Sequence, residues 1–442
     1  MQAKRIMIDG YNLALEKGTG VATYSRNLSL ELSKLGNKID LLYGVRASTG
    51  KNPLLSEVNF FDGVTKGLKT SEVVNTMVRS PFGLEACEVP ITGKVVARNP
   101  LRVLPEYDRI FNRRNLFVMA RWHFRVWGKF MDTSYQQSAS IAHWTYPLPI
   151  RLKGAANIYT IHDLVPLRLP YTTLDNKREY YRTIREIAER ADHIVTVSET
   201  SKRDIIDLFG VPESRVTNTY QSVSLPQKIL DRGSEDVASE VEAIFGLEPK
   251  KYFLFFGAIE PKKNVARIIE AYLASRSKLP LVIVGQVTWN NDNDLRLVKV
   301  SQARQQVSAE RRADMTVSEA SSGGQIVRLD YLPLNLLTSL IRCARAVVFP
   351  SLYEGFGLPI LEAMQLGTAV ITGTEGSNPE VAGDGAYLVD PYDVGAITRA
   401  IRDLQSDSDM VEHYETAGRE RAKMFSPERY SERLDELYSR LG

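Results

Sequence analysis

The chain has 442 residues, of which 43% are hydrophobic and 25% are charged, values typical of a folded globular protein and not of a disordered or collagen-like chain. The formal net charge of +3, from 56 basic and 53 acidic residues, is too small for a general nucleic-acid-binding protein, so we expect no nucleic-acid partner. The two cysteines, Cys87 and Cys343, lie far apart without metal-ligand spacing. They argue against a disulfide framework or a structural zinc site and favour a reducing cytoplasm.

No apolar run approaches the roughly 20 residues that span a bilayer, and the apolar stretch before Asp9 is too short for a signal peptide. We therefore expect a cytoplasmic protein that meets a membrane, if at all, as a peripheral protein on the cytoplasmic face.

The first half of the chain alternates strands and helices. A strand at 5–9 precedes a glycine turn at Gly18–Gly20, which opens a helix to about Gly36, and a second strand follows at 39–43. Residues 47–140 have no regular pattern. Order returns with a strand at 157–161, a helix at 175–191, a strand at 193–197 and Ser198 as an N-cap. This order predicts a doubly wound parallel sheet.

A second α/β cycle follows a stretch at 226–249 that we interpret as a linker. Its predicted elements are strands at 252–256, 281–284, 326–329 and 346–349, helices at 264–274 and 334–343, and a polar insertion at 288–324. The tail at 427–441 has apolar residues at helical spacing. We predict domains at 1–225 and 250–425, with residues 426–442 forming a helix that returns to the first domain.

One glycine turn is the strongest chemical signal. In PSLYEGFGLPILEAM, residues 350–364, a strand leads through Gly355 and Gly357 into a helix with Pro359 in its first turn. A helix N-terminus offers unpaired N–H groups and partial positive charge to a diphosphate. Glu354 and Glu362 could accept hydrogen bonds from paired hydroxyls. The alternative is an ordinary glycine-rich turn with two solvated glutamates.

The spacing of these glutamates, with seven residues between them, resembles the retaining GT-B glycosyltransferases of family 4. The resemblance extends to GTGVATY at 18–24, TIHDLVPL at 160–167, ADHIVTVSETSKRDI at 191–205 and FFGAIEPKKN at 255–264. It implies a GT-B architecture, in which two Rossmann-like domains face each other across a cleft. The N-terminal domain would bind the acceptor and the C-terminal domain the nucleotide-sugar donor.

The resemblance also assigns roles in donor binding. Glu354 would contact the transferred sugar, and Glu362 the ribose hydroxyls. Backbone amides at three positions would face the sugar and phosphates: Phe356, Gly357 and Leu358. Lys262 and Lys263 would balance the charge of the leaving diphosphate, Lys263 being the better match. Many relatives have an arginine where this chain has Ala258, so more of that role would fall to the lysines.

In the first half of the chain, His162 matches the family's active-site histidine and, with Glu354 and Lys263, completes the predicted catalytic set. Asp163 could orient the imidazole or cap the next turn. The loop Gly18, Thr19 and Gly20 resembles one that closes over the phosphates, although Gly20 could simply begin a helix. Asn378 and Glu380 resemble a loop beside the nucleotide sugar.

We therefore expect a retaining hexosyltransferase that needs no cofactor or metal, since the triplet Asp292-Asn293-Asp294 sits in a polar insertion without a flanking strand. The preferred donor is GDP-mannose, with a UDP-sugar as the alternative. The acceptor would be a carbohydrate or lipid-linked oligosaccharide in bacterial surface polysaccharide or lipopolysaccharide synthesis. The competing interpretations are a nucleotide-sugar epimerase or hydrolase, and a non-catalytic sugar-binding partner.

Residues 101–130 combine basic and aromatic side chains. The basic residues are Arg102, Arg109, Arg113, Arg114, Arg121, Arg125 and Lys129, and the aromatic ones are Phe111, Phe117, Trp122, Phe124 and Trp127. Such a segment could rest on anionic lipid headgroups of the inner leaflet. A buried helix with a solvated arginine face explains the pattern equally well.

Overall fold

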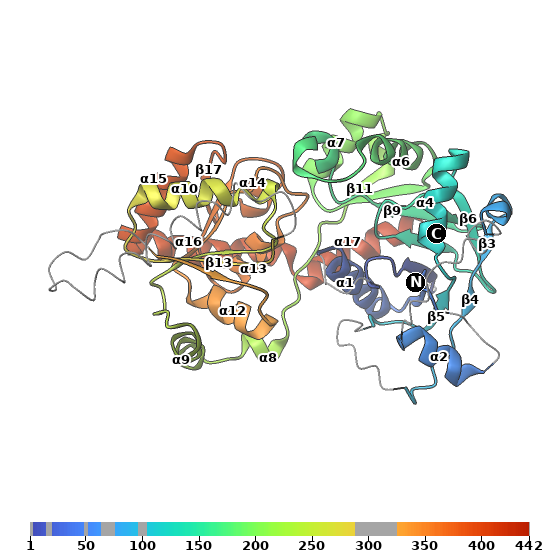
Figure 1. Ribbon diagram of the computed structural model, residues 1–442, viewed down its shortest axis with the longest axis horizontal. Coiled ribbons are helices and arrows are strands. Elements are labelled where there is room, and N and C mark those ends of the chain that lie inside the picture. Colours follow the sequence, from blue (N-terminus) through green and yellow to red (C-terminus); the bar gives the residue numbers. More distant parts are fainter. Residues whose placement is uncertain are drawn as a thin grey trace, which may run out of the picture. The chain divides into compact units, whose positions relative to one another are not determined.

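A computed structural model of the chain describes residues 3–14, 20–47, 52–62, 76–95, 104–287 and 325–441. The chain divides into two compact units. Unit 1 comprises residues 1–167, 175–222 and 427–442, and unit 2 comprises residues 168–174 and 223–426. Each unit is an α/β structure built on a largely parallel sheet (Figure 1), as the alternation of elements predicts.

The main sheet of unit 1 has eight strands in the order β11-β10-β9-β7-β1-β2-β5-β4. Their bounds are β1 Arg5–Asp9, β2 Lys38–Tyr43, β4 Cys87–Glu88, β5 Arg109–Asn112, β7 Ile141–Trp144, β9 Ala156–Thr160, β10 His193–Thr196 and β11 Val216–Asn218. The pairs are parallel except for β4 with β5. A small parallel sheet of β3 (Leu84–Glu85), β6 (Met131–Ser134) and β8 (Ile150–Leu152) lies in the same unit. The chain leaves β1 toward β2 on one side, and β7 joins β1 on the other, so the strand order reverses between β1 and β7.

Helices accompany these strands throughout unit 1. The helices are α1 Gly20–Lys34, α2 Pro53–Asp62, α4 Leu116–Trp127, α5 Val165–Arg168, α6 Lys177–Arg190, α7 Glu199–Phe209 and α17 Pro427–Arg440, with 3-10 turns at η1 Ser80–Phe82 and η4 Glu213–Arg215. The 3-10 turn η3 Pro170–Thr172 lies in the stretch 168–174, which belongs to unit 2. The predicted cap is confirmed, because the Ser198 hydroxyl accepts a hydrogen bond from the backbone N–H of Ser201 at 3.0 Å. The pattern-based strands at 5–9 and 39–43 are also confirmed, the second beginning one residue earlier.

The C-terminal helix α17 belongs to unit 1, where it packs against α1. Its buried residues are Tyr430, Leu434, Leu437 and Tyr438. The Tyr438 hydroxyl is hydrogen-bonded to Nδ1 of His143, whose Nε2 lies 2.6 Å from Oγ1 of Thr160 at the end of β9. Helix α17 therefore helps to hold the strand from which His162 follows.

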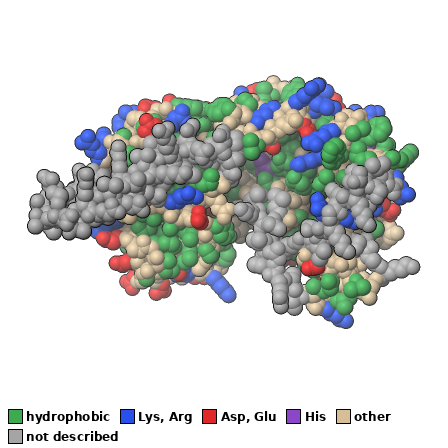
Figure 2. All heavy atoms as spheres, viewed as in Figure 1, with side chains coloured by type: hydrophobic (Ala, Val, Ile, Leu, Met, Phe, Trp, Pro, Cys, Tyr) green, Lys and Arg blue, Asp and Glu red, His purple; other side chains and the backbone are tan. Residues whose placement is uncertain are grey.

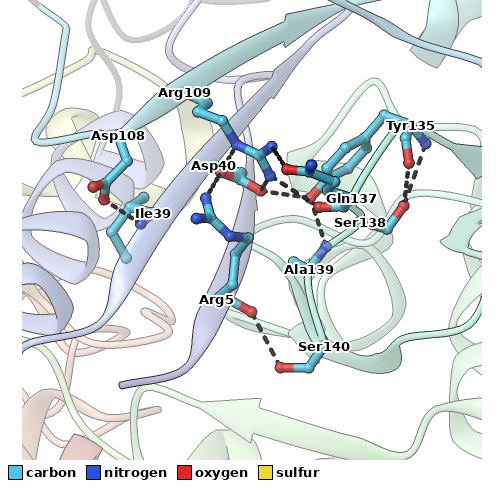
Figure 3. A network of polar contacts seen from close by, with 10 residues as sticks. All are labelled: Arg5, Ile39, Asp40, Asp108, Arg109, Tyr135, Gln137, Ser138, Ala139 and Ser140. Carbon is cyan, nitrogen blue, oxygen red and sulfur yellow. Dashed lines mark hydrogen bonds and ion pairs between the residues drawn. The ribbon is translucent and has the colours of Figure 1, made fainter. Parts of the chain in front are cut away.

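A buried carboxylate joins the first strands of unit 1 (Figure 3). Asp40 on β2 has no exposed side-chain surface and accepts from Arg5 at 2.9 Å and from Arg109 at 2.7 Å, while the Tyr135 hydroxyl lies 3.1 Å away. Since a charge this deep requires partners, the two arginines balance it. Arg109 is therefore committed to the interior of unit 1, which corrects its place among the residues predicted for lipid contact.

Unit 2 contains a six-stranded parallel sheet in the order β14-β13-β12-β15-β16-β17. Its strands are β12 Phe253–Phe256, β13 Leu281–Val284, β14 Ile326–Leu329, β15 Ala346–Phe349, β16 Val370–Gly373 and β17 Tyr387–Val389. Its helices are α8 Gln227–Leu230, α9 Ser234–Phe245, α10 Val265–Ser275, α12 Leu334–Cys343, α13 Leu358–Gln365, α14 Asn378–Ala382, α15 Val394–Ser406 and α16 Ser408–Ala422, with η5 Pro261–Lys263 and η6 Lys423–Phe425. Here the strand order reverses between β12 and β15.

The interpretation of residues 226–249 as a linker between domains is wrong, because these residues form helices that belong to unit 2. This stretch forms α8 and α9, and α9 packs on α12 within unit 2. Val237 and Val241 are its buried residues. Their spacing of four residues is a short helical pattern, which the surrounding polar residues obscured.

Among the residues that the structure describes, no helix combines the length and apolar character needed to cross a bilayer.

Candidate active site

The carboxyl ends of β12 and β15 in unit 2 bring two sequence motifs together. Parallel α/β sheets bind ligands outside the carboxyl ends of their strands, where the strand order reverses, and β12 and β15 are the neighbours at that point. The segment with Lys262 and Lys263 follows β12, and the segment with Glu354 follows β15. Residues separated by 91 positions thus lie at one sheet edge.

Lys263 and Glu354 form a close ion pair at this edge. The Lys263 Nζ lies 2.6 Å from the Glu354 Oε1 and 4.8 Å above the ring of Phe349, while the Lys262 Nζ lies 4.0 Å from the Glu354 Oε2. The side chains of Lys263 and Glu354 are 12% and 8% exposed. Burial alone would raise the pKa of Glu354, but the two lysines outweigh it and lower that pKa. The glutamate is therefore ionised at neutral pH and holds both cations near the strand ends.

Asn264 holds the two segments in place. Its backbone has a φ of +63°, and its side-chain amide donates to the carbonyls of Pro350 at 3.0 Å and Pro391 at 2.7 Å. The backbone N–H of Leu352 donates to the carbonyl of Lys262 at 2.8 Å. Sequence reasoning included Asn264 in the EPKKN motif but gave it no role, although an asparagine before a helix is a common left-handed residue.

The glycine turn enters α13 as predicted. Gly357 is its N-cap with a φ of +96°, a conformation that residues with a side chain rarely adopt, and Pro359 lies in the first turn. A Cβ at Gly357 would lie 3.0 Å from Cδ1 of Ile360. In this turn Pro359 has no N–H and Ile360 donates its N–H to the Gly357 carbonyl at 3.0 Å. The N–H of Leu358 and the positive end of the helix dipole are therefore what the start of α13 offers to an anion. The Phe356 ring itself is buried and packs edge-on against Phe425 at 5.4 Å, so a ligand role at this position falls to the backbone.

Glu362 lies just over one turn into α13 and is half-buried. Burial raises its pKa to about 7, although Lys263 partly offsets that effect. Glu354 and Glu362 are thus two carboxyl groups with opposite pKa shifts on one strand–turn–helix element. Near neutral pH the protein can keep the first charged while the second exchanges its proton.

Asn378, predicted to lie beside the nucleotide sugar, is fully buried at the start of α14. Its amide donates to the Ser351 carbonyl at 3.2 Å and contacts the Ser351 hydroxyl at 3.0 Å. The neighbouring Ser377 hydroxyl donates to the Glu354 carbonyl at 2.9 Å. These contacts fix the backbone at Ser351 and at Glu354 itself. The carbonyl of Glu380, in the middle of α14, accepts from Arg421.

In unit 1, His162 follows β9 near the point where the strand order reverses. Its Nε2 lies 2.9 Å from the Thr145 carbonyl, which can only accept, so Nε2 carries a proton. Burial lowers the pKa of His162, partly offset by Thr145 and Asp163. The neutral ring therefore has an unprotonated Nδ1. Tyr24 packs edge-on against the ring at 4.9 Å, and Asp163 accepts from the backbone N–H of Val165 at 3.0 Å, which is the capping alternative.

Asp9, at the end of β1, supports the residue that holds His162. It is fully buried, and its Oδ2 accepts from both the backbone N–H and the hydroxyl of Thr145, the second at 2.8 Å, while Oδ1 accepts from the N–H of Tyr11 at 3.1 Å. Burial raises the pKa of Asp9 to about 6 against these hydrogen bonds. Sequence reasoning missed Asp9 and Thr145, because their pairing spans 136 positions; the one signal was an aspartate ending an apolar strand.

The remaining predicted site residues have different outcomes. Gly20 is the first residue of α1, whereas Gly18 and Thr19 lie outside the described residues, as does the triplet Asp292-Asn293-Asp294. In unit 2 the structure brings Lys262, Lys263, Glu354, Gly357 and Glu362 to one sheet edge. The roles assigned to these residues stay predictions.

Comparison with known proteins identifies the family. The model described as Glycosyltransferase Family 4 matches residues 18–225, and the model Glycosyl transferases group 1 matches residues 239–421. The chain is 32% identical over 284 residues to O-antigen chain mannosyltransferase B of Escherichia coli, a match that covers 63% of this chain and 68% of that protein. It is 29% identical over 270 residues to the serotype-specific mannosyltransferase WbdA of Escherichia coli, covering 60% of this chain and 31% of that protein.

Solved structures show the same fold. The structure of HepE from Anabaena in complex with UDP-glucose covers 99% of this chain and 100% of its own, with a TM-score of 0.63 and 12% sequence identity. At that identity the likeness establishes the fold alone, which is the GT-B fold predicted. Together with the family matches across both units, it shows that the chain belongs to the group 1 glycosyltransferases of family 4.

Proposed function

We propose that the chain transfers mannose from GDP-mannose, with retention of anomeric configuration and without a metal ion, to a sugar acceptor that is lipid-linked, in bacterial O-antigen or other surface polysaccharide synthesis. The observation that carries this proposal is the 32% identity to an O-antigen chain mannosyltransferase, joined to the ion pair of Lys263 and Glu354 where the strand order reverses. The proposed setting is the cytoplasm.

The residues of unit 2 suit the donor. The N-terminus of α13 would receive the diphosphate, and Lys262 and Lys263 would neutralise it. Glu362 would accept hydrogen bonds from the ribose hydroxyls. Glu354 would hold a hydroxyl of the transferred sugar and keep Lys263 in position.

The reaction would proceed on one face of the sugar. The bond from C1 to the diphosphate oxygen breaks, the acceptor oxygen bonds to C1 from the same face, and the acceptor proton passes to the departing diphosphate. The demand on the protein is stabilisation of a cationic sugar and an anionic leaving group, which preorganised lysines and helix-end amides meet. His162 would contact the donor sugar, with the proton on Nε2 held by Thr145.

The test is thermal stabilisation by GDP, GDP-mannose, UDP and UDP-glucose, measured in parallel for the wild type and Glu362→Ala. A ligand that binds the native state raises its stability. GDP-mannose should stabilise the wild type and not the variant, and incubation with acceptor should release GDP and a mannosylated product. Stabilisation by UDP compounds instead would identify a UDP-sugar-dependent transferase, and an altered nucleotide sugar without acceptor would identify an epimerase. The absence of nucleotide binding would favour a non-catalytic partner.

A further inference from the structure

Helix α4 of unit 1 exposes an apolar face. Val118, Trp122 and Val126 lie at intervals of four residues and are 42%, 48% and 58% exposed, and Trp127 beside them is 53% exposed. The opposite face, which includes Phe117 and Phe124, is buried in the core of unit 1. Helix α4 therefore has two apolar faces: one packs in the core of unit 1, and the other is exposed at the surface.

A second segment extends this apolar face. The hydroxyl of Ser80 in η1 lies 2.7 Å from the Nδ1 of His123 on α4, which fixes η1 beside the helix. Next to Ser80 the side chains of Phe82 and Val78 are 91% and 66% exposed. A contiguous group of large exposed hydrophobic side chains marks an interaction site, whereas scattered ones are ordinary.

Basic residues border the same face. A pocket of about 710 Å³ lies between Trp127 and Pro81 on one side and the β8–β9 turn on the other, and its basic residues are Lys129, Arg151, Lys153 and Arg190. Arg151 pairs with Asp132 at 2.6 Å, and Arg190 pairs with Glu186 at 2.7 Å. Lys129 and Lys153 are exposed, and neither has an ion pair with any described residue. The acidic residues that line the pocket are Asp132, which pairs with Arg151, and Asp192, which accepts from the backbone N–H of Asn157 at 2.6 Å. Lys129 and Lys153 thus offer two ammonium groups to an anion beside an aromatic surface.

Figure 2 shows hydrophobic side chains beside Lys and Arg side chains over the region of α4 and α6. Arg125 adds to this pattern, since its guanidinium lies 5.6 Å from the Trp122 ring centroid and pairs with Glu179 at 2.8 Å. Tryptophan favours the boundary between headgroups and acyl chains. Lysine gains from a negatively charged leaflet.

We propose that these residues form a docking surface for an anionic phospholipid bilayer. The surface, which we call the α4 surface, comprises Val78, Phe82, Val118, Trp122, Val126, Trp127, Lys129 and Lys153. The tryptophans and Phe82 enter the headgroup boundary, and the pocket with Lys129 and Lys153 receives headgroup phosphates. This inference goes beyond the transfer reaction and does not depend on it. It also separates the residues of the segment 101–130 that face the membrane from those that stabilise the fold. Arg109 pairs with Asp40, and Arg121 donates to the Tyr11 hydroxyl at 2.8 Å, so both stabilise the fold.

The experiment measures binding of the full chain to vesicles by co-sedimentation. One set of vesicles contains phosphatidylethanolamine and phosphatidylglycerol, and the other contains phosphatidylcholine alone. Wild type should bind the anionic set, and the bound fraction should fall as salt screens the lysines. Trp122→Ala/Trp127→Ala should lower the partition coefficient more than about tenfold, since each half-exposed ring removes on the order of 100 Å² of apolar contact. Lys129→Glu/Lys153→Glu should lower it at least about 25-fold at low salt, about fivefold for each lost positive charge.

Matched controls lie in unit 2. Ile244→Ala/Tyr331→Ala removes two exposed hydrophobic side chains, and Lys228→Glu/Lys278→Glu reverses two exposed lysines; both variants should bind as the wild type does. Thermal midpoints and nucleotide binding report on folding independently of vesicles. Equal binding to phosphatidylcholine, wild-type binding by both α4 variants, or equal loss in the controls would overturn the proposal. So would self-association of the wild type that the tryptophan variant abolishes, because a second copy of the chain would then be the occupant.

Discussion

Removal of the Lys263 ammonium is the sharpest test of the donor-site geometry. Lys263→Ala leaves the carboxylate of Glu354, 8% exposed, without the partner that lies 2.6 Å away in the wild type. Breaking a buried ion pair by removing one partner destabilises a protein by about 3–5 kcal/mol. Lys262, at 4.0 Å from the same carboxylate, retains part of the compensation. We therefore expect a loss of about 3 kcal/mol in the free energy of unfolding.

The sign of the pH dependence follows from the pKa of Glu354, which the wild-type protein lowers from 4.5. The contribution of the ionised carboxylate to stability is present above pH 4.5 and is lost as the pH falls through the lower native pKa. Without Lys263, burial raises the pKa of this carboxyl relative to the wild type. The difference in stability between wild type and Lys263→Ala should therefore be largest at neutral pH and smaller at pH 5.

The assay combines urea unfolding at pH 7.5 and pH 5 with turnover at saturating donor, for Lys263→Ala, Glu354→Gln and the double variant. Lys263→Ala should lower turnover about 10²–10³-fold by removing a preorganised charge from the leaving group. The double variant should regain about 1–2 kcal/mol of stability relative to Lys263→Ala, since no unpaired carboxylate remains, yet stay as inactive. Near-normal turnover of Lys263→Ala would refute the catalytic role. A double variant no more stable than Lys263→Ala would refute the buried-pair reasoning.

Three further predictions concern other parts of the molecule. The pKa of Glu362 is raised from 4.5 to about 7, so this side chain should destabilise the fold progressively as the pH rises from 4.5 through 7. Glu362→Gln should therefore be about 1–3 kcal/mol more stable than wild type at pH 8 and nearly equal to it at pH 4.5. Unfolding curves that show the same difference at both pH values would contradict this. Asp9→Ala leaves the backbone N–H and hydroxyl of Thr145 without the acceptor they have in the wild type and should destabilise unit 1 by about 2–3 kcal/mol. Asp9→Asn keeps one acceptor oxygen and should retain more activity than Asp9→Ala. Equal turnover in the two variants would show that Thr145 does not depend on this carboxylate. Dialysis against EDTA should leave turnover unchanged, and recovery of a lost activity by added Mg²⁺ or Mn²⁺ would disprove metal independence.

The sequence by itself determined those elements whose signals are local. The strand at 5–9 was located by its apolar run, and the N-cap at Ser198 by one residue type before a helix, and both match the structure. The sequence also predicts the turn from β15 into α13, because Gly357 and Pro359 have backbone preferences that few other residues share. The spacing of Glu354 and Glu362 within one such element, together with four further motifs, indicates the family.

Tertiary structure alone decided the partners of these residues. In the segment 47–140, the described strands have two to four residues, and several pair with distant parts of the chain, so no strand pattern there exceeds the length of a chance apolar run. The helices α2 and α4 in this segment are longer, but the apolar residues of α4 lie on both its buried and its exposed sides and form no single stripe. The pairing of Lys263 with Glu354 and the support of His162 by Thr145 and Asp9 join positions from 17 to 136 residues apart. A parallel sheet brings the carboxyl ends of its strands to one edge regardless of their order along the chain. The spacing of residues along the sequence therefore does not predict which side chains contact one another at that edge.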